Sequence, residues 1–158
     1  MREKRKLGGP RPPLLLLKHI ATLGPVGYLP LAPGTWGTLV SAVFVALLRP
    51  SAPIHAALIL IFTFLGVYSA HHAEKAIGMN DPGHIVIDEF AGYLIASFFL
   101  PQTYGYIIAS FILFRVFDVL KPPPINFFDR PGGLGIMADD IVAGIMANIV
   151  LQIWRAFA

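Results

Sequence analysis

Apolar residues gather in long runs along this chain, and most charged residues stand near the ends of those runs. Five runs are the clearest, over residues 36–48, 54–70, 85–100, 104–120 and 141–154. Runs of this length are typical of helices rather than of strands. The shortest would rise about 20 Å as a helix, less than the roughly 30 Å of a bilayer core. The pattern predicts an all-α fold, a compact bundle of about five to six short helices that is membrane-embedded or membrane-associated.

The segment before the first run, residues 13–33, is also apolar, but glycine and proline interrupt it repeatedly. Such punctuation favours a short interfacial or re-entrant helix over a full span. Residues 1–18 carry six basic groups and one acid, a charge of +5 that leaves −2 for the other 140 residues. We expect a basic cytoplasmic tail at 1–18 near anionic headgroups, not a cleaved signal peptide, and one helical domain at 19–158.

The composition strengthens the membrane interpretation. Of 158 residues, 56% are hydrophobic and only 13% are charged, whereas about 25% charged residues is usual in a soluble domain. The mean hydropathy is +0.68. These values exclude a nucleic-acid-binding module, a disordered tail and an ordinary soluble enzyme, so no nucleic-acid partner is expected. The lack of cysteine excludes disulfides, zinc thiolate sites and cysteine nucleophiles.

The positions of the charges suggest how the helices alternate in direction. If the tail lies inside the cell and the runs cross the membrane in turn, every acid from Glu74 to Asp140 lies at a cytoplasmic helix end. Only Arg49 and Arg155 then fall on the far side. This arrangement predicts termini on opposite faces and acids that converge on the cytoplasmic face.

Seven carboxylates share that predicted face: Asp81, Asp88, Glu89, Asp118, Asp129, Asp139 and Asp140. The nearby cations, mainly Arg115, Lys121 and Arg130, are too few to neutralise them. Ionisable groups at membrane depth are costly and therefore indicate functional sites. A hard divalent cation such as Mg²⁺ would relieve the repulsion, because carboxylate oxygens suit it. The alternative is that Asp88, Asp139 and Asp140 cap helix N-termini.

Arg115, Asp118 and Lys121 follow one another at intervals of three residues, so successive members share a helical face. The two cations are suited to hold a phosphate beside a metal bound by Asp118. The alternative is a neutralised Arg–Asp pair inside the bundle. The three prolines after Lys121 are expected to end the helix.

Two glycine-containing segments precede predicted helices. Residues 33–38, PGTWGT, offer backbone N–H groups and the hydroxyls of Thr35 and Thr38 to a phosphate, or else form an ordinary N-cap. Residues 132–135, GGLG, form either a flexible loop or a segment packed closely over a ligand.

Four motifs, in the same order, resemble those of the phosphatidylglycerophosphatase A family. They are PGTWGT at 33–38, IDEFAG at 87–92, FRVFDVLKPPP at 114–124 and GGLGIMADDIVAG at 132–144. The resemblance runs from about residue 20 to the C-terminus. It implies an all-helical fold and Mg²⁺-dependent hydrolysis of phosphatidylglycerophosphate to phosphatidylglycerol and phosphate at the bacterial cytoplasmic (inner) membrane.

This chemistry agrees with the residues, because a phosphomonoester dianion requires charge neutralisation and an in-line nucleophile, for which we expect metal-bound water. The expected catalytic and metal-binding acids are Asp88, Glu89, Asp118, Asp139 and Asp140. Glu89, Asp118 and Asp140, one from each cluster, are the expected principal ligands. Asp88 and Asp139 are left as second ligands, water-orienting bases or caps. The expected phosphate-binding residues are Thr35, Thr38, Arg115, Lys121 and Arg130.

We expect an active site that faces the cytoplasm, with a phospholipid substrate and the membrane as partners, and the pattern leaves a homo-oligomer open. Two other functions fit a small helical membrane protein with clustered acids. One is a CDP-alcohol phosphotransferase-like enzyme, although the D-G-x-x-A-R signature is missing. The other is a small transporter with an acidic cation site, which is expected to place polar groups nearer the middle of the membrane.

Overall fold

The computed structural model describes residues 12–77, 83–128 and 132–157, and within these ranges it is entirely helical. Its elements are α1 (Pro12–Ala21), the 3₁₀ turn η1 (Val26–Tyr28), α2 (Pro33–Leu48), α3 (Ala52–Ile77), α4 (Ile87–Ala96), α5 (Tyr104–Leu120), the 3₁₀ turn η2 (Ile125–Phe127) and α6 (Gly133–Phe157). The predicted all-α fold is therefore confirmed. The predicted tail at 1–18 lies outside the described residues as far as residue 11 and is helical from Pro12 onward.

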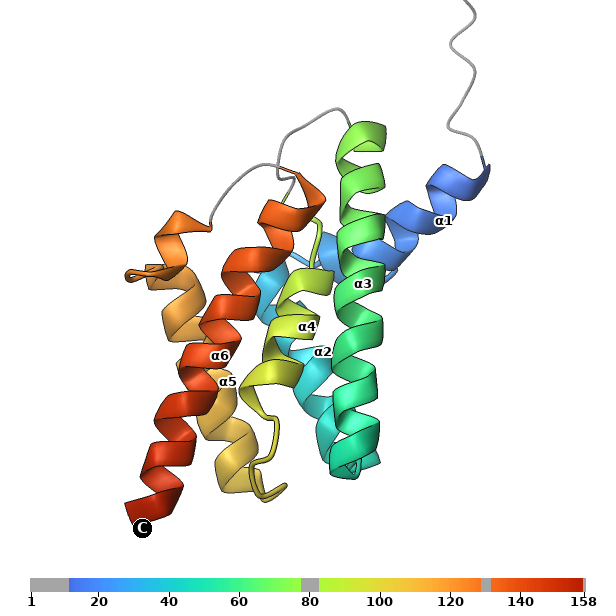
Figure 1. Cartoon of the computed structure of the whole chain (residues 1–158). Coiled ribbons are helices and arrows are strands. Elements are labelled where there is room, and N and C mark those ends of the chain that lie inside the picture. The colour runs from blue at the N-terminus through green and yellow to red at the C-terminus, as the bar shows by residue number, and fades with distance from the viewer. Residues whose placement is uncertain (1–11, 78–82, 129–131, 158) are drawn as a thin grey trace, which may run out of the picture.

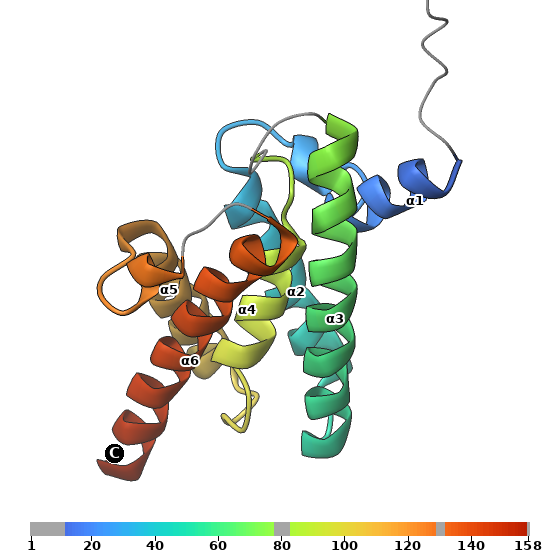
Figure 2. The same cartoon turned by 45° about the horizontal axis from the view of Figure 1, so that its top comes forward.

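The short helix α4 lies in the middle of the bundle and packs against α2, α3, α5 and α6 (Figure 1). Successive helices alternate in direction, so the C-terminal ends of α3 and α5 lie at the same end of the bundle as the N-terminal ends of α4 and α6. Helix α1 lies beside the C-terminal half of α3 in both views (Figure 2). The alternation predicted from the charge map is thus present in the helices.

Two helix boundaries differ from the sequence-based expectation. Helix α6 begins at Gly133 rather than near residue 141, so Asp139 and Asp140 lie in its second turn. Residues 132–135, expected to be either a flexible loop or a segment packed closely over a ligand, are mostly the first turn of this helix. Helix α4 is shorter than predicted, because it ends at Ser97, whose hydroxyl donates back to the Tyr93 carbonyl at 3.0 Å. Helix α5 ends at Lys121, which has a left-handed φ of 43°, directly before the prolines as predicted.

Helices α4 and α6 cross with their backbones in direct contact. A Cβ on Gly144 of α6 would collide with the carbonyl oxygen of Gly92 in α4. A Cβ on Gly92 would lie 2.6 Å from the ring of Phe114 and 2.8 Å from the carbonyl oxygen of Asp140. Asp88 and Asp140 each precede one of these glycines by four residues, one helical turn. The crossing therefore sets the separation between the two acids.

The outer faces of the bundle carry many exposed apolar side chains, such as Leu60 and Phe64 on α3 and Ile108 and Ile112 on α5. Within the described residues, α3 and α6 are long and apolar enough to cross a membrane by length and composition. The apolar window of α3 is only 17% buried inside the protein, so its surface is not that of a core helix. Helix α4, at ten residues, extends only about 15 Å and is too short to span. Of the five apolar runs that the sequence offers as possible spans, two correspond to described helices that pass this test.

The backbone contact at Gly144 generates the first prediction. Gly144→Ala should lower the free energy of unfolding by about 1–3 kcal/mol, because α4 and α6 must separate to admit the new methyl group. Denaturant unfolding in detergent measures this change. Gly105→Ala in α5 is the matched control, since its Cβ would meet only Thr103 Oγ1, at 4.0 Å. Equal stability of the two variants would show that the crossing is not tightly packed.

Candidate metal and phosphate site

Three carboxylates meet at the end of the bundle where α4 and α6 begin. Asp88 and Glu89 lie in the first turn of α4, and Asp140 comes from the second turn of α6. One oxygen from each lies within 4.8 Å of the others. Asp88 is 8% exposed and Asp140 only 3% exposed. One oxygen of each residue, Asp88 Oδ1, Glu89 Oε2 and Asp140 Oδ2, is buried without a hydrogen-bond partner.

The electrostatics of this group favour a bound proton or cation. Burial raises the pKa of Asp88 well above its usual value, and the negative charges of Glu89 and Asp139 raise it further. Burial also raises the pKa of Glu89 to about 7, although a hydrogen bond with Asp88 and the charge of Arg115 act in the opposite direction. Unpaired buried oxygens on closely spaced carboxylates are the ligand type that Mg²⁺ prefers. The donor set therefore fits a hard divalent cation, with Asp88, Glu89 and Asp140 as its holders.

Two basic residues from α5 border the carboxylates. The Arg115 guanidinium contacts the Asp118 carboxylate, and its Nη1 lies 3.8 Å from Glu89 Oε1. Lys121 Nζ donates a hydrogen bond to Asp139 Oδ2 at 2.8 Å. The side chains of Arg115 and Lys121 are 18% and 30% exposed, so both reach the rim of the site. They are accessible cations beside a buried anionic cluster.

The first turn of α2 closes another side of the site. A Cβ on Gly34 would collide with Glu89 Oε1 and would lie 3.1 Å from Arg115 Nη1. Thr38 is fully buried, and its hydroxyl donates to the Gly34 carbonyl at 2.8 Å within the same helix. Thr35 lies nearer the helix start and is partly exposed. The sequence motif indicated this segment through its threonines, but Gly34 is the residue whose lack of a side chain admits Glu89.

The structure brings together most of the residues predicted for the site. Its described part includes the five acids Asp88, Glu89, Asp118, Asp139 and Asp140, the cations Arg115 and Lys121, and the threonines Thr35 and Thr38. Asp118 contacts Arg115 and also interacts with Asp140, so it connects the cations to the cluster. Asp81, Asp129 and Arg130 lie outside the described residues.

The capping alternative is wrong for Asp139 and Asp140 but holds in part for Asp88. Val86 is the N-cap of α4, and Asp88 lies in the first turn, where its carboxylate accepts the backbone N–H of Glu89 and the helix dipole favours an acid. Asp139 and Asp140 lie six and seven residues beyond Gly133, the first residue of α6. Neither position lets a side chain reach the free N–H groups at the start of the helix. Helix capping therefore does not explain the burial of Asp139 and Asp140.

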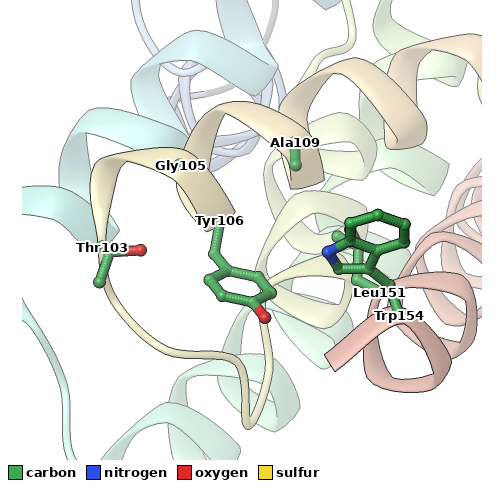
Figure 3. A pocket seen from close by; sticks show the side chains of 6 residues that line it. All are labelled: Thr103, Gly105, Tyr106, Ala109, Leu151 and Trp154. Atoms are coloured by element: carbon green, nitrogen blue, oxygen red, sulfur yellow. The ribbon is translucent and has the colours of Figure 1, made fainter. Parts of the chain in front are cut away.

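A separate cavity of about 380 Å³ lies at the opposite end of the bundle, between the start of α5 and the end of α6 (Figure 3). Tyr106 and Trp154 line it together with small residues such as Gly105 and Ala109. Among the residues that the structure describes, no acidic or basic side chain lines this cavity. It offers no group for phosphate or metal chemistry, which leaves the carboxylate cluster as the candidate active site.

Comparison with known proteins identifies a family for the sequence. The model of the family described as Phosphatidylglycerophosphatase A matches residues 19–155. A Haemophilus influenzae protein named "Phosphatidylglycerophosphatase A" is 38% identical over 157 residues, covering 87% of this chain and 95% of the relative. An Escherichia coli protein of the same name is 39% identical over 129 residues, covering 79% and 75%.

A third relative carries a different name. It is a Bacteroides thetaiotaomicron protein named "Putative phosphatidylinositol-3-phosphatase", 38% identical over 143 residues, which covers 82% of this chain and 87% of that protein. No solved structure matches the chain. The names of these relatives agree that a phosphate on a lipid is the reacting group, but they differ in the lipid headgroup.

The second prediction follows from the suitability of the three carboxylates for a divalent cation. Saturating Mg²⁺, near 100 times its dissociation constant, should raise the unfolding temperature in detergent by about 5–10 °C, because it binds only the folded cluster. Asp140→Asn should abolish most of this shift. Glu74→Gln should keep it, because Glu74 lies at the same end but accepts the Gly132 N–H at 3.3 Å outside the cluster. A wild-type unfolding temperature that responds to neither EDTA nor Mg²⁺ would contradict the cation site.

Proposed function

The chain belongs to the phosphatidylglycerophosphatase A family and is thus a phosphatase, and on this premise we propose that it hydrolyses phosphatidylglycerophosphate to phosphatidylglycerol and phosphate with Mg²⁺ as its cofactor. The observation that carries the proposal is the cluster of Asp88, Glu89 and Asp140, with oxygens within 4.8 Å of one another. Arg115 and Lys121 border this cluster as accessible cations. A metal-binding pocket beside phosphate-binding cations is what a phosphomonoester dianion requires.

In the proposed site, one group of residues holds the cation and another binds the phosphate. Asp88, Glu89 and Asp140 would hold the ion, with Asp118 and Asp139 beside them. A bound Mg²⁺ supplies charge neutralisation and lowers the pKa of water, so that a nucleophile forms at neutral pH. The guanidinium of Arg115 presents paired N–H donors to phosphoryl oxygens. Its contact with Asp118 keeps the side chain pointed toward the cluster before substrate binds.

Lys121 and the start of α2 complete the proposed phosphate site. Lys121 ends α5, and its bond to Asp139 holds the ammonium group over α6. Thr35 lies in the first turn of α2, where the helix dipole favours an anion and the threonine hydroxyl can donate to it. Thr38 is one turn deeper and supports the Gly34 carbonyl. Arg130, also expected to bind phosphate, lies outside the described residues.

Two apolar helices and the family indicate association with a membrane. We place the protein in the bacterial cytoplasmic (inner) membrane with the carboxylate cluster on the cytoplasmic side. The support is the distribution of basic residues, because Lys18 and Lys75 lie on segments at the cluster end of the bundle. Cytoplasmic segments of membrane proteins are enriched in Lys and Arg.

The two other functions considered from sequence are less well supported. Hydrolysis follows from the family, whereas a CDP-alcohol phosphotransferase requires a signature that the chain lacks. A transporter is expected to hold its ion near the middle of the membrane. Here the carboxylates gather in the first turn of α4 and the second turn of α6, at one end of the bundle.

Phosphate release from lipid vesicles or mixed micelles tests the proposal, and Asp118→Asn gives the third prediction. This variant keeps the shape of the side chain but removes one negative charge and the strong contact with Arg115. We expect kcat to fall by about two to four orders of magnitude, because charge neutralisation and phosphate positioning weaken together. The measurement is a Mg²⁺ titration with phosphatidylglycerophosphate and, for comparison, phosphatidylinositol 3-phosphate.

Arg115→Lys is the companion variant for that assay. It keeps the positive charge but loses the bidentate fork, so it should mainly raise KM for the lipid. Near-normal turnover by Asp118→Asn at low Mg²⁺ would reduce Asp118 to a simple pairing partner of Arg115. Wild-type hydrolysis of the inositol lipid alone would overturn the proposed substrate.

The fourth prediction concerns orientation. Helix α6 runs from the cluster end of the bundle to the opposite end (Figure 1). A reporter that is active only outside the cytoplasm should therefore be active when fused after residue 158 and silent when fused to the N-terminus. A stably expressed but silent C-terminal fusion would contradict the assigned orientation.

A further inference from the structure

An apolar groove of about 310 Å³ runs between α2 and α5 on the side of the bundle. Leu39, Ala42 and Ala46 line it from α2, and Tyr104, Ile108 and Phe111 line it from α5. Ala42 and Ala46 are separated by four residues, so their small side chains lie on one face of α2. Beside Leu39 and Val43 on the same face, these two alanines leave space against α5 that larger side chains would fill.

The groove leads to the carboxylate cluster along both of its walls. On α5, Phe111 precedes Arg115 by four residues, so the wall of the groove continues into the phosphate-binding cation. On α2, Leu39 follows Thr35 by four residues in the same way. The two helices meet again at the cluster, where a Cβ on Gly34 would lie 3.1 Å from Arg115 Nη1. A molecule bound in the groove would thus have one end at the phosphate site.

The distance from the far end of the groove to Arg115 matches one leaflet of a bilayer. Tyr104 and Arg115 are eleven residues apart on α5, which is a rise of about 16 Å. Half of a typical hydrocarbon core is about 15 Å. The groove is open to the outer surface, since its lining residues Val43 and Ile108 are 48% and 57% exposed. An occupant therefore enters from the hydrocarbon side and needs no opening to water.

We propose that the groove between α2 and α5 binds one acyl chain of the phospholipid whose phosphate is held at Arg115. The inference rests on the proposed lipid phosphatase function and extends it to the substrate's tail. Among the described residues, no charged side chain lines the groove, so its walls suit hydrocarbon. An acyl chain that enters from the bilayer gains packing contacts with these walls rather than transfer from water. The groove thereby favours a long-chain lipid monoester over its deacylated headgroup, which cannot make these contacts.

The cavity at the far end of the bundle provides an internal comparison. Ala109 lines it from α5 and Trp154 lines it from α6 (Figure 3). By helical spacing, Ala109 lies on a different face of α5 from Ile108 and Phe111, which line the groove. It is a similarly sized space, but it does not continue to Arg115. Filling it should affect packing in the same way as filling the groove, without affecting the substrate's tail.

The fifth prediction uses this pair of sites. Ala46→Phe fills the groove, and Ala109→Phe fills the far cavity. Phosphate release is measured from a long-chain phosphatidylglycerophosphate and from its deacylated, water-soluble headgroup. We expect Ala46→Phe to lower the ratio of kcat/KM for lipid to kcat/KM for headgroup by about tenfold or more. Ala109→Phe should keep the wild-type ratio.

The possible outcomes distinguish a failure of the groove proposal from a failure of the proposed phosphatase function. An unchanged ratio in Ala46→Phe, or an equal drop in both variants, would overturn the groove proposal while the phosphatase function stands. A wild-type enzyme that releases phosphate from neither substrate would overturn the function and the groove together. A change of oligomeric state in Ala46→Phe, measured in detergent, would instead assign the groove to contact between two copies of the chain.

A second measurement covers the case in which Ala46→Phe fails to fold. The wild-type protein is irradiated with a phosphonate analogue of the lipid that carries a photoreactive group midway along one acyl chain. Mass spectrometry should locate the cross-links on the groove faces of α2 and α5, and free phosphate should not change their positions. Cross-links spread evenly over the lipid-facing helices would overturn the proposal.

Discussion

The site depends on the backbone contact between α4 and α6 at Gly92 and Gly144. A Cβ at Gly144 would collide with the carbonyl of Gly92, so the two helices lie closer than residues with side chains allow. Asp88 and Asp140 stand one turn before the two glycines, toward the same end of the bundle. A wider crossing would move the carboxylates apart and lose the cluster. The two glycines therefore fix both the packing of the central helices and the geometry of the cluster.

Close carboxylates oppose the folding that brings them together. Burial raises the pKa of Glu89 to about 7, which means that its charged form is disfavoured at the site. Arg115 and Lys121 from α5 offset part of this repulsion through their contacts with Asp118 and Asp139. Apolar residues of similar volume would make a more stable bundle, because buried ionic groups rarely add net stability. Stability therefore does not explain these acids, whereas the proposed cation and phosphate binding would.

The convergence of the acids could be predicted because helices that alternate in direction bring the start of one run beside the end of the next. Glu89 lies near the start of its run and Asp118 near the end of the following one, so the two carboxylates lie close enough to interact. The start of α6 could not be predicted, because GGLG reads as a loop when only local propensity is considered. Gly133 is instead required by packing, since a Cβ there would lie 2.6 Å from the His71 backbone nitrogen in α3. The role of Gly34 could not be predicted for the same reason, because the residue that it makes room for, Glu89, is 55 positions away in the sequence.

The surface of α5 changes from apolar to charged over a short length, and this places the proposed active site near one end of the bundle. Ile112 is 54% exposed on the outer surface, and Arg115, three residues later, faces the carboxylate cluster. The change from a lipid-facing to a phosphate-facing surface therefore takes one helical turn, about 5 Å. A lipid keeps its acyl chains in hydrocarbon while its phosphate stays at the surface, so its two parts are separated over a similarly short distance. A site at the middle of the bundle would require the charged headgroup to enter hydrocarbon, at a cost that placement at the helix ends avoids.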